Sequence, residues 1–304
     1  MSFSTDVKNE IADKYEPSQC CKASLLYGLL ISANIFDGNR IRFTSENRVI
    51  AELLARLIRE VFAFEVLIDT PAETAGRKSA YHRVLINDRA QLDKILETYG
   101  YTRYTLSFRV SDSVFDCEQC AAAFVKGVFL SCGAIMSPKK ACHLEFVFSH
   151  LNLSRDIAQV LADNFAEPKA TVRKNAYVLY YKDSEQNEDF LSYIGAQKYA
   201  FEIMDTKILK DLRNNANRIT NCETANIEKT ADAARDQIRA IEKIGAAGRM
   251  DELPDDIIRT ARFRMEYQEA TLKEIGEMFT PSVTKSGINH RMRKIMSLAQ
   301  EIGE

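Results

Sequence analysis

Apolar residues recur in the same arrangement in two parts of the chain that lie about a hundred positions apart. Residues 21–28 (CKASLLYG) and 120–127 (CAAAFVKG) both begin with cysteine, continue through small and apolar residues, and reach glycine. Each continues as an apolar run that ends in small residues. An apolar helix with glycine on one side favours a close helical partner, because the missing side chain lets two backbones approach. The pattern therefore predicts two copies of one helix, paired in a pseudo-twofold domain.

The segments that follow the two helices repeat one order of elements. Period-two alternation predicts strands at 40–44, 64–68, 81–86, 143–148, 170–173 and 176–181. Amphipathic patterns predict helices at 49–62, 90–99, 157–165 and 189–194. The order αββαββα, given twice, predicts an α+β domain in which helices back a saddle of antiparallel strands.

The last fifty or so residues carry a different signal. Thr271 and Glu274 form the pattern of a capping box, which opens a short amphipathic helix. Pro281 interrupts the run, and Ser282 or Thr284 can cap a further helix over about residues 285–300. A helix, a break and a second helix predict an all-α helix-turn-helix domain.

The second helix of this pair has an apolar face and a basic face. Its apolar stripe comprises Ile288, Met292, Ile295 and Ala299. The opposite face and its flanks carry Lys285, Ser286, Asn289, His290, Arg291, Arg293 and Lys294. No acidic residue occurs between positions 278 and 300, although the preceding helices are rich in Asp and Glu. This segregation of charge predicts DNA binding, with Ser286, Asn289, His290 and Arg293 at base edges and Lys285, Arg291 and Lys294 at phosphates.

A long helical segment joins the two parts. Its seam, spaced by three and four residues, comprises Ile227, Ala231, Ala234, Ile238, Ile241 and Gly245. The seam could dimerise, but its short length favours packing within the chain, and residues 245–248 predict a hinge. We expect a duplicated domain at 1–203 (repeats about 20–100 and 116–200), a helical linker at 204–248 and the helix-turn-helix at 249–304.

Composition and net charge limit the classes of protein to which the chain can belong. The 304 residues are 46% hydrophobic and 28% charged, which is ordinary for a globular protein. Apolar runs fall short of the ~18 residues of a membrane span, and the polar first residues do not form a secretory signal, so we expect a cytoplasmic protein with no membrane partner. The glycines form no phosphate-binding loop, and we expect no small-molecule substrate. A net charge of −2 gives no global attraction to DNA, so any DNA contact is local.

The cysteines and histidines suggest no catalytic centre. Seven Cys in an unsecreted chain favour free thiols. Cys20 and Cys21 and the pair Cys117 and Cys120 lie at the starts of the two repeated helices, so duplication could bring four sulfurs together. Their spacing is not a standard zinc spacing and no His lies within ten residues of either pair, so we expect no metal and no cofactor. The remaining candidates, in or next to strand patterns without a neighbouring nucleophile, are interpreted as structural: His82, His143 and His150.

Residues 20–200 resemble the LAGLIDADG homing endonucleases in their tandem helices, small-residue helix ends and order of strands. The resemblance implies that the two helices pair at the pseudo-twofold axis and that an acidic residue at each helix end holds a divalent cation for phosphodiester cleavage. When Gly28 and Gly127 are aligned with the motif's first glycine, the acidic positions fall on Ala33 and Cys132. Neither can hold magnesium, so nuclease activity is expected to be lost.

The strand faces combine both signs of charge. One surface could carry Arg40, Arg42, Arg83 and Arg173 together with Glu65, Asp69 and Glu145. The acidic side chains would offset much of the attraction for phosphate. The saddle is therefore a candidate surface for either DNA or protein.

Three segments resemble the bacterial WhiA family, which joins a degenerate LAGLIDADG domain to a helix-turn-helix of the sigma-factor region-four type. The most specific is SGINHRMRKI at 286–295, and the others are 2–10 and 217–226. The resemblance implies a nucleoid-associated, sequence-specific transcriptional regulator linked to cell division, chromosome segregation or sporulation in Gram-positive bacteria. Its implied partners are double-stranded DNA and RNA polymerase or another regulator. The alternatives are a protein-interaction scaffold in cell division and a residual metal-dependent endonuclease.

Overall fold

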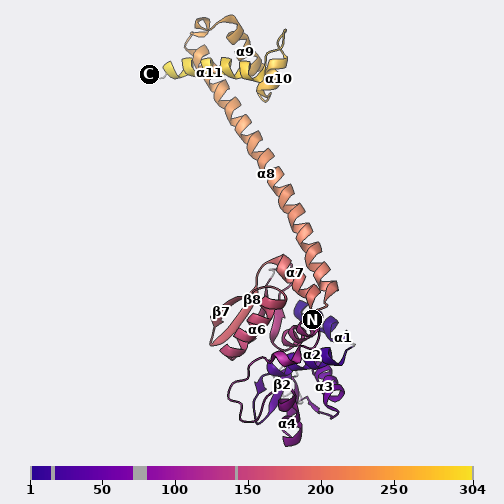
Figure 1. The fold of residues 1–304 in the computed structure, drawn as a ribbon. Coiled ribbons are helices and arrows are strands. Elements are labelled where there is room, and N and C mark those ends of the chain that lie inside the picture. Colours follow the sequence, from indigo (N-terminus) through magenta and orange to yellow (C-terminus); the bar gives the residue numbers. More distant parts are fainter. Residues whose placement is uncertain (1, 15–17, 71–80, 141–142, 303–304) are drawn as a thin grey trace. The chain divides into compact units, whose positions relative to one another are not determined.

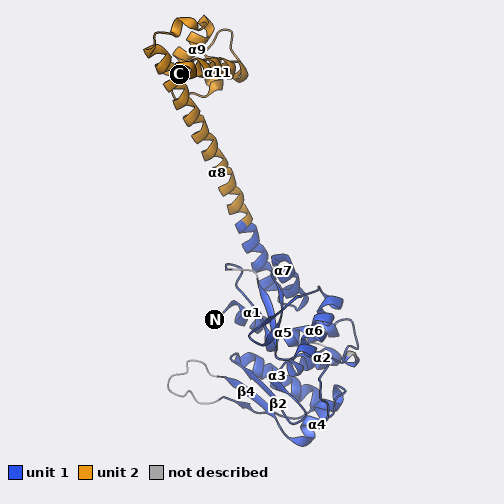
Figure 2. Cartoon of the chain, turned by 90° about the vertical axis from the view of Figure 1, so that its left-hand side faces the viewer, with its two compact units in different colours: residues 1–210 blue, residues 211–304 orange. Residues whose placement is uncertain are grey.

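The computed structural model of the chain describes residues 2–14, 18–70, 81–140 and 143–302. It divides into two compact units, Met1–Lys210 and Asp211–Glu304, coloured separately in Figure 2. Figure 1 shows the fold of each unit along the chain. We describe the two units in turn.

The first unit contains one helix and then two copies of the same order of elements (Figure 1). After α1 (Phe3–Asp13), the first copy comprises α2 (Gln19–Ile31), β1 (Ile35–Phe36), β2 (Ile41–Ser45), α3 (Arg48–Phe62), β3 (Ile68–Asp69), β4 (His82–Ile86) and α4 (Arg89–Thr98). The second comprises α5 (Cys120–Cys132), β5 (Gly133–Ile135), β6 (Leu144–Phe148), α6 (Leu151–Asn164), β7 (Lys169–Arg173), β8 (Ala176–Tyr181) and α7 (Ser184–Tyr193). The predicted duplication of the order αββαββα is confirmed.

Each copy builds one four-stranded antiparallel sheet. The strand orders are β1-β2-β4-β3 and β5-β6-β8-β7, so the two sheets have the same topology. Phe43 pairs with Val84 in the first sheet, and Phe146 pairs with Leu179 in the second. All four side chains are buried, while alternate residues such as Arg42 and Glu145 are only partly covered. The period-two pattern thus places one face of each sheet on the core.

The two repeated helices, α2 and α5, pack with their backbones in close contact. A Cβ atom added at Gly28 would lie 2.2 Å from the carbonyl oxygen of Phe124, and one at Gly127 would lie 2.2 Å from that of Leu25. Side chains on nearly every side of α2 are buried, which explains why its sequence is apolar without a polar stripe. The close helix pairing predicted from the glycines is confirmed.

The long helix α8 (Gln197–Ala246) contributes to the core of both units. Ala200 and Ile203 near its start are buried in the first core, and Ile241 and Ile244 near its end are buried in the second. Of the expected seam, Ala234 is 7% exposed but Ile227 is 69% exposed. The seam therefore packs within the chain only over its last turns.

The second unit packs the end of α8 against three further helices (Figure 1). They are α9 (Asp255–Glu266), α10 (Leu272–Glu277) and α11 (Lys285–Glu301), and a short 3₁₀ helix, η2 (Met250–Glu252), precedes them. Gly248 has a φ of +68° and turns the chain after α8, but Ile244 before the turn and Leu253 after it belong to one core. The hinge expected at residues 245–248 is therefore wrong, because this turn lies inside the unit. Among the described residues, no helix combines the length and apolarity needed to cross a membrane.

The glycine contact predicts how the first unit responds to a single methyl group. Gly28→Ala should lower the free energy of unfolding by about 1–3 kcal/mol, because its Cβ would overlap a backbone carbonyl that cannot rotate away. Gly245→Ala is the matched control, since a Cβ there meets nothing within 4 Å. Urea unfolding followed by far-ultraviolet circular dichroism measures both. Equal midpoints for Gly28→Ala and the parent chain would show that the close approach is not required.

Candidate nucleic-acid interface

A capping box fixes the start of α10. Thr271 Oγ1 accepts a hydrogen bond from the Glu274 backbone N–H at 3.3 Å, and the Thr271 N–H donates to Glu274 Oε2 at 2.7 Å. Hydrogen bonds from Thr271 also hold the pKa of the Glu274 carboxyl below its usual range. The capping box predicted from the sequence is confirmed, and it defines where the first helix of the helix-turn-helix begins.

The turn between α10 and α11 depends on a second close backbone contact. The Val283 N–H donates to the Gly276 carbonyl at 2.9 Å, and a Cβ at Gly276 would lie 2.1 Å from the Val283 carbonyl oxygen. Thr284 then caps α11 by accepting from the Gly287 N–H at 3.2 Å. Of the two cap candidates in the sequence, Thr284 is the one used, and the turn sets the direction in which α11 leaves.

The two faces of α11 follow the pattern in the sequence. Ile288, Met292 and Ile295 are at most 1% exposed and pack on the core of the second unit. The opposite side chains are exposed at Lys285, Ser286, His290, Arg293 and Lys294 and half-buried at Asn289. Across the described residues, no carboxylate forms an ion pair with Lys285, Arg293 or Lys294. The exposed face thus has uncompensated positive charge beside hydrogen-bonding groups.

Arg291 has a different environment from its neighbours. Its Nε lies 3.1 Å from Asp256 Oδ2, its Nη1 donates to Thr260 Oγ1 at 3.4 Å, and its guanidinium lies over the Phe279 ring at 5.0 Å. Only 19% of the side chain is exposed. These contacts turn the guanidinium toward α9, so Arg291 joins α9 to α11, and its expected phosphate contact stays a prediction.

A second structural arginine was missed in the sequence. Arg264 is 1% exposed, and its guanidinium donates to Gln237 Oε1 at 3.0 Å and to the Gln268 and Ala270 carbonyls at 3.2 and 2.5 Å. Burial lowers the pKa of this guanidinium. One indication of this burial was present in the sequence: Arg264 lies seven positions after Ile257, which is also buried, and so shares its helix face. Arg264 thus connects α8 to the segment before α10, and it stabilises the start of the helix-turn-helix.

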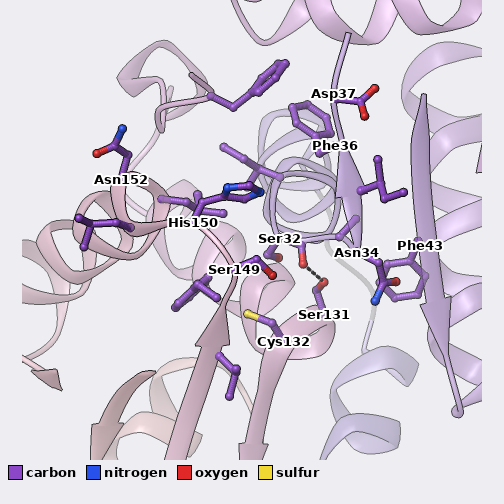
Figure 3. A pocket seen from close by; sticks show the side chains of 18 of the residues that line it. Ser32, Asn34, Phe36, Asp37, Phe43, Ser131, Cys132, Ser149, His150 and Asn152 are labelled. Atoms are coloured by element: carbon purple, nitrogen blue, oxygen red, sulfur yellow. Dashed lines mark hydrogen bonds between the residues drawn. The ribbon is translucent and has the colours of Figure 1, made fainter. Parts of the chain in front are cut away.

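The other candidate site lies at the carboxyl ends of α2 and α5. These ends border a cavity of about 940 Å³ whose wall includes both Ala33 and Cys132. Figure 3 shows Cys132 in this wall beside Ser131. Ser131 Oγ donates to the Ser32 carbonyl oxygen at 2.8 Å and ties the two helix ends together. The positions that the endonuclease resemblance makes acidic therefore meet as the resemblance implies, but they carry a methyl group and a thiol.

The first carboxylates that follow the two helix ends in the sequence, Asp37 and Glu145, have other partners. Asp37 Oδ1 accepts from the backbone N–H groups of Asn39 and Arg40 at 2.8 and 2.9 Å, which holds it in its own turn. Glu145 lies 3.0 Å from Arg173 and 3.2 Å from His143. Asp37 lines the cavity, whereas Glu145 is not among its lining residues.

A lysine amine lies beside the second degenerate position. Lys8 Nζ donates to the Leu130 carbonyl at 3.0 Å, and burial lowers the pKa of this amine to about 8. Burial raises the pKa of the neighbouring Cys132 thiol to about 12. At neutral pH the lysine is therefore mainly charged and the thiol neutral. A local positive charge with no carboxylate disfavours a divalent cation at this helix end.

Charges on the strand faces compensate one another. Arg83 lies 3.6 Å from Asp69, Arg173 pairs with Glu145, and Glu65 lies 3.3 Å from Arg59. Arg40 is exposed and Arg42 is half-buried. The offset of attraction expected on this surface is therefore present at three of its acidic residues.

Two of the three histidines expected to be structural have polar partners. His82 Nδ1 is hydrogen-bonded to Thr70 at 3.0 Å, His143 contacts Glu145, and His150 directly precedes α6. His150 also lines the cavity at the helix ends (Figure 3). The structural role expected for these histidines stays a prediction.

Comparison with known proteins identifies the chain's relatives. The family model of the WhiA C-terminal helix-turn-helix domain matches residues 216–299, and that of the WhiA LAGLIDADG-like domain matches residues 121–213. A protein of Clostridium botulinum (strain Hall) named probable cell division protein WhiA is 33% identical over 311 residues, which cover 99% of each chain. A protein of Ruminiclostridium cellulolyticum with the same name is 34% identical and covers 99% of this chain and 98% of its own. The chain belongs to the WhiA family.

Solved structures agree with this assignment at the level of the fold. Full-length WhiA from Thermotoga maritima has a TM-score of 0.58 at 23% identity, with all of both chains covered. The N-terminal LAGLIDADG domain of a WhiA protein has a TM-score of 0.50 at 21% identity and covers 64% of this chain and 90% of its own. The α+β domain with two LAGLIDADG-like repeats, the long helix and the C-terminal helix-turn-helix are thus shared with the family.

The environments of Arg291 and Arg293 predict effects of different size for the same substitution. Arg291→Ala should destabilise the second unit by about 1–3 kcal/mol, because it removes charged hydrogen bonds and a cation–π contact. Arg293→Ala, two positions along the same helix and exposed, should change stability by less than ~0.5 kcal/mol. Thermal unfolding of the two full-length variants compares them directly. Equal stabilities would show that the contacts of Arg291 do not stabilise the second unit.

Proposed function

We propose that the chain is a sequence-specific DNA-binding regulator in which α11 reads the duplex and the LAGLIDADG-like unit has no nuclease activity. The observation that carries the proposal is the acid-free face of α11, whose cations Lys285, Arg293 and Lys294 project from a helix fixed by a capped turn. In helix-turn-helix proteins the second helix lies in the major groove with its N-terminal residues at base edges. The capped first turns of α11 have the required exposure.

The side chains of α11 suggest a division of tasks. Asn289 and Arg293 have the geometry for paired hydrogen bonds to a base, as Asn favours adenine and Arg favours guanine. Ser286 and His290 lie on the same exposed face and complete the base-reading set. Lys285 and Lys294 are flexible cations that neutralise phosphates without reading sequence.

The first unit would supply a second contact. On its strand faces Asp69 and Glu145 neutralise Arg83 and Arg173, which favours a protein partner over a phosphate backbone. RNA polymerase or another regulator fits this role, and it would place the protein on the nucleoid. The relatives' name connects the family to cell division, and we extend this connection to transcription control in division, chromosome segregation or sporulation.

The proposed division of tasks can be tested on the full chain. Asn289→Ala or Arg293→Ala should relax sequence choice at one position and cost about 1–3 kcal/mol on the preferred duplex. Lys294→Ala should weaken binding on all duplexes alike and reduce the slope of log affinity against log salt by about 0.9. Fluorescence anisotropy with duplexes selected from a random pool, at several salt concentrations, separates the two effects. Uniform weakening by Asn289→Ala would remove it from the base-reading set.

The loss of nuclease activity has its own test. Supercoiled DNA and duplexes bearing the selected site should stay intact with magnesium or manganese at high protein concentration, because the helix ends offer no carboxylate. Asp37→Asn and Glu145→Gln serve as controls for any trace of nicking. Nicking by the parent chain that either variant abolished would show that the metal site has moved.

A further inference from the structure

Four cysteine sulfurs meet at the amino ends of α2 and α5, away from the cavity at the opposite ends of the same helices. The Sγ atoms of Cys20, Cys21, Cys117 and Cys120 all lie within 4.8 Å of one another. Cys21 and Cys120 are fully buried at 1% and 0% exposure, whereas Cys117 reaches the surface. Two of these residues come from each repeat of the duplicated domain.

The sulfur separations fit a single tetrahedral metal ion. Cys117 Sγ lies 3.7 Å from Cys20 Sγ, 3.6 Å from Cys21 Sγ and 3.4 Å from Cys120 Sγ. Zinc binds thiolate sulfur at ~2.3 Å, which puts the sulfurs of a tetrahedral site about 3.8 Å apart. A disulfide needs ~2.0 Å, and all four residues are free thiols here. A cluster with several iron atoms would push its sulfurs farther apart than they are.

Backbone structure holds the ligands in place. Cys20 and Cys21 lie in the first turn of α2, where the Cys21 N–H donates to the capping Ser18 hydroxyl at 3.3 Å. Cys120 is the first residue of α5, and its N–H donates to the Cys117 carbonyl at 3.0 Å. Both helices begin at these cysteines, so the positive ends of their dipoles favour thiolates there, against the burial that raises the pKa of the Cys21 thiol. The set is therefore positioned before any ion binds.

Neither half of this set forms a recognisable zinc motif by itself. One repeat contributes adjacent cysteines and the other contributes a Cys-x-x-Cys pair, with Cys21 and Cys117 separated by 96 positions. Pairing of α2 with α5 joins the halves, and four cysteines complete a site without histidine. The expectation of no metal depended on the spacing of the cysteines in the sequence. This spacing cannot reveal a site whose ligands come from two copies of a repeat.

We propose that Cys20, Cys21, Cys117 and Cys120 bind one zinc ion as four thiolates and so join the two repeats at the amino ends of their paired helices. With four protein ligands no coordination position is open to water, which makes the ion structural and not catalytic. Binding releases the thiol protons to solvent and involves no redox step. The ion would hold the amino ends of α2 and α5 together, as Ser131 and the small residues hold their carboxyl ends together.

Metal analysis of the intact chain tests the proposal. The parent chain, purified in reducing buffer without chelator, should retain one equivalent of zinc by elemental analysis and native mass spectrometry. Cys117→Ser should lose zinc affinity by at least ~100-fold, since even an outer partner of a ligand is worth up to that factor. Cys222→Ser is the matched control, because Cys222 is also an exposed cysteine but lies far along the chain on α8.

A titration of the parent chain gives a test that does not depend on whether the variants fold. The chelated, reduced parent chain should take up Co²⁺ with thiolate-to-cobalt absorption that saturates at one equivalent and is displaced by zinc. Failure to bind zinc or cobalt with all thiols reduced would overturn the proposal. So would retention of iron in place of zinc, a disulfide among these cysteines in the freshly isolated chain, or equal zinc binding by Cys117→Ser and Cys222→Ser.

Discussion

The contact of two helix backbones at Gly28 and Gly127 is the constraint on which the first unit depends. A side chain at either position would overlap a carbonyl oxygen of the other helix. Because the helices touch at these points, their carboxyl ends meet at the cavity and their amino ends bring four cysteines together. One packing contact thus determines the geometry of two sites that lie at opposite ends of the same helix pair.

The proposed loss of nuclease chemistry and the retention of the fold have separate physical causes. The fold needs small residues where α2 and α5 touch, and these are present. Cleavage needs carboxylates at the helix ends, and Ala33 and Cys132 stand there with the Lys8 amine beside Cys132. Charge is distributed differently in the two units: on the saddle Arg83 and Arg173 pair with acidic residues, while Lys285, Arg293 and Lys294 of α11 have no acidic partner among the described residues. This contrast directs the proposed DNA contact to the second unit.

Much of this architecture could be predicted from periodicity and repetition. The duplicated order of elements, the glycine-mediated helix pair, the capping box at Thr271 and the apolar stripe of α11 all follow from local patterns, and all are present. Tertiary packing decided the rest. Residues 245–248 have the composition of a hinge, but Ile244 and Leu253 on either side share one core. Arg291 has the sequence signature of a DNA contact, but Asp256 and Phe279 approach it from outside α11.

The most direct test of the account is photocross-linking of the full chain to a duplex selected from a random pool. A cross-linking residue would replace either Ser286 on α11 or Thr171 on β7, which is exposed and alternates onto the same strand face as Arg173. The account predicts cross-links to bases from position 286 and none to DNA from position 171. Cross-links from position 171 with none from position 286 would contradict it, because sequence would then be read by the saddle and not by the last helix.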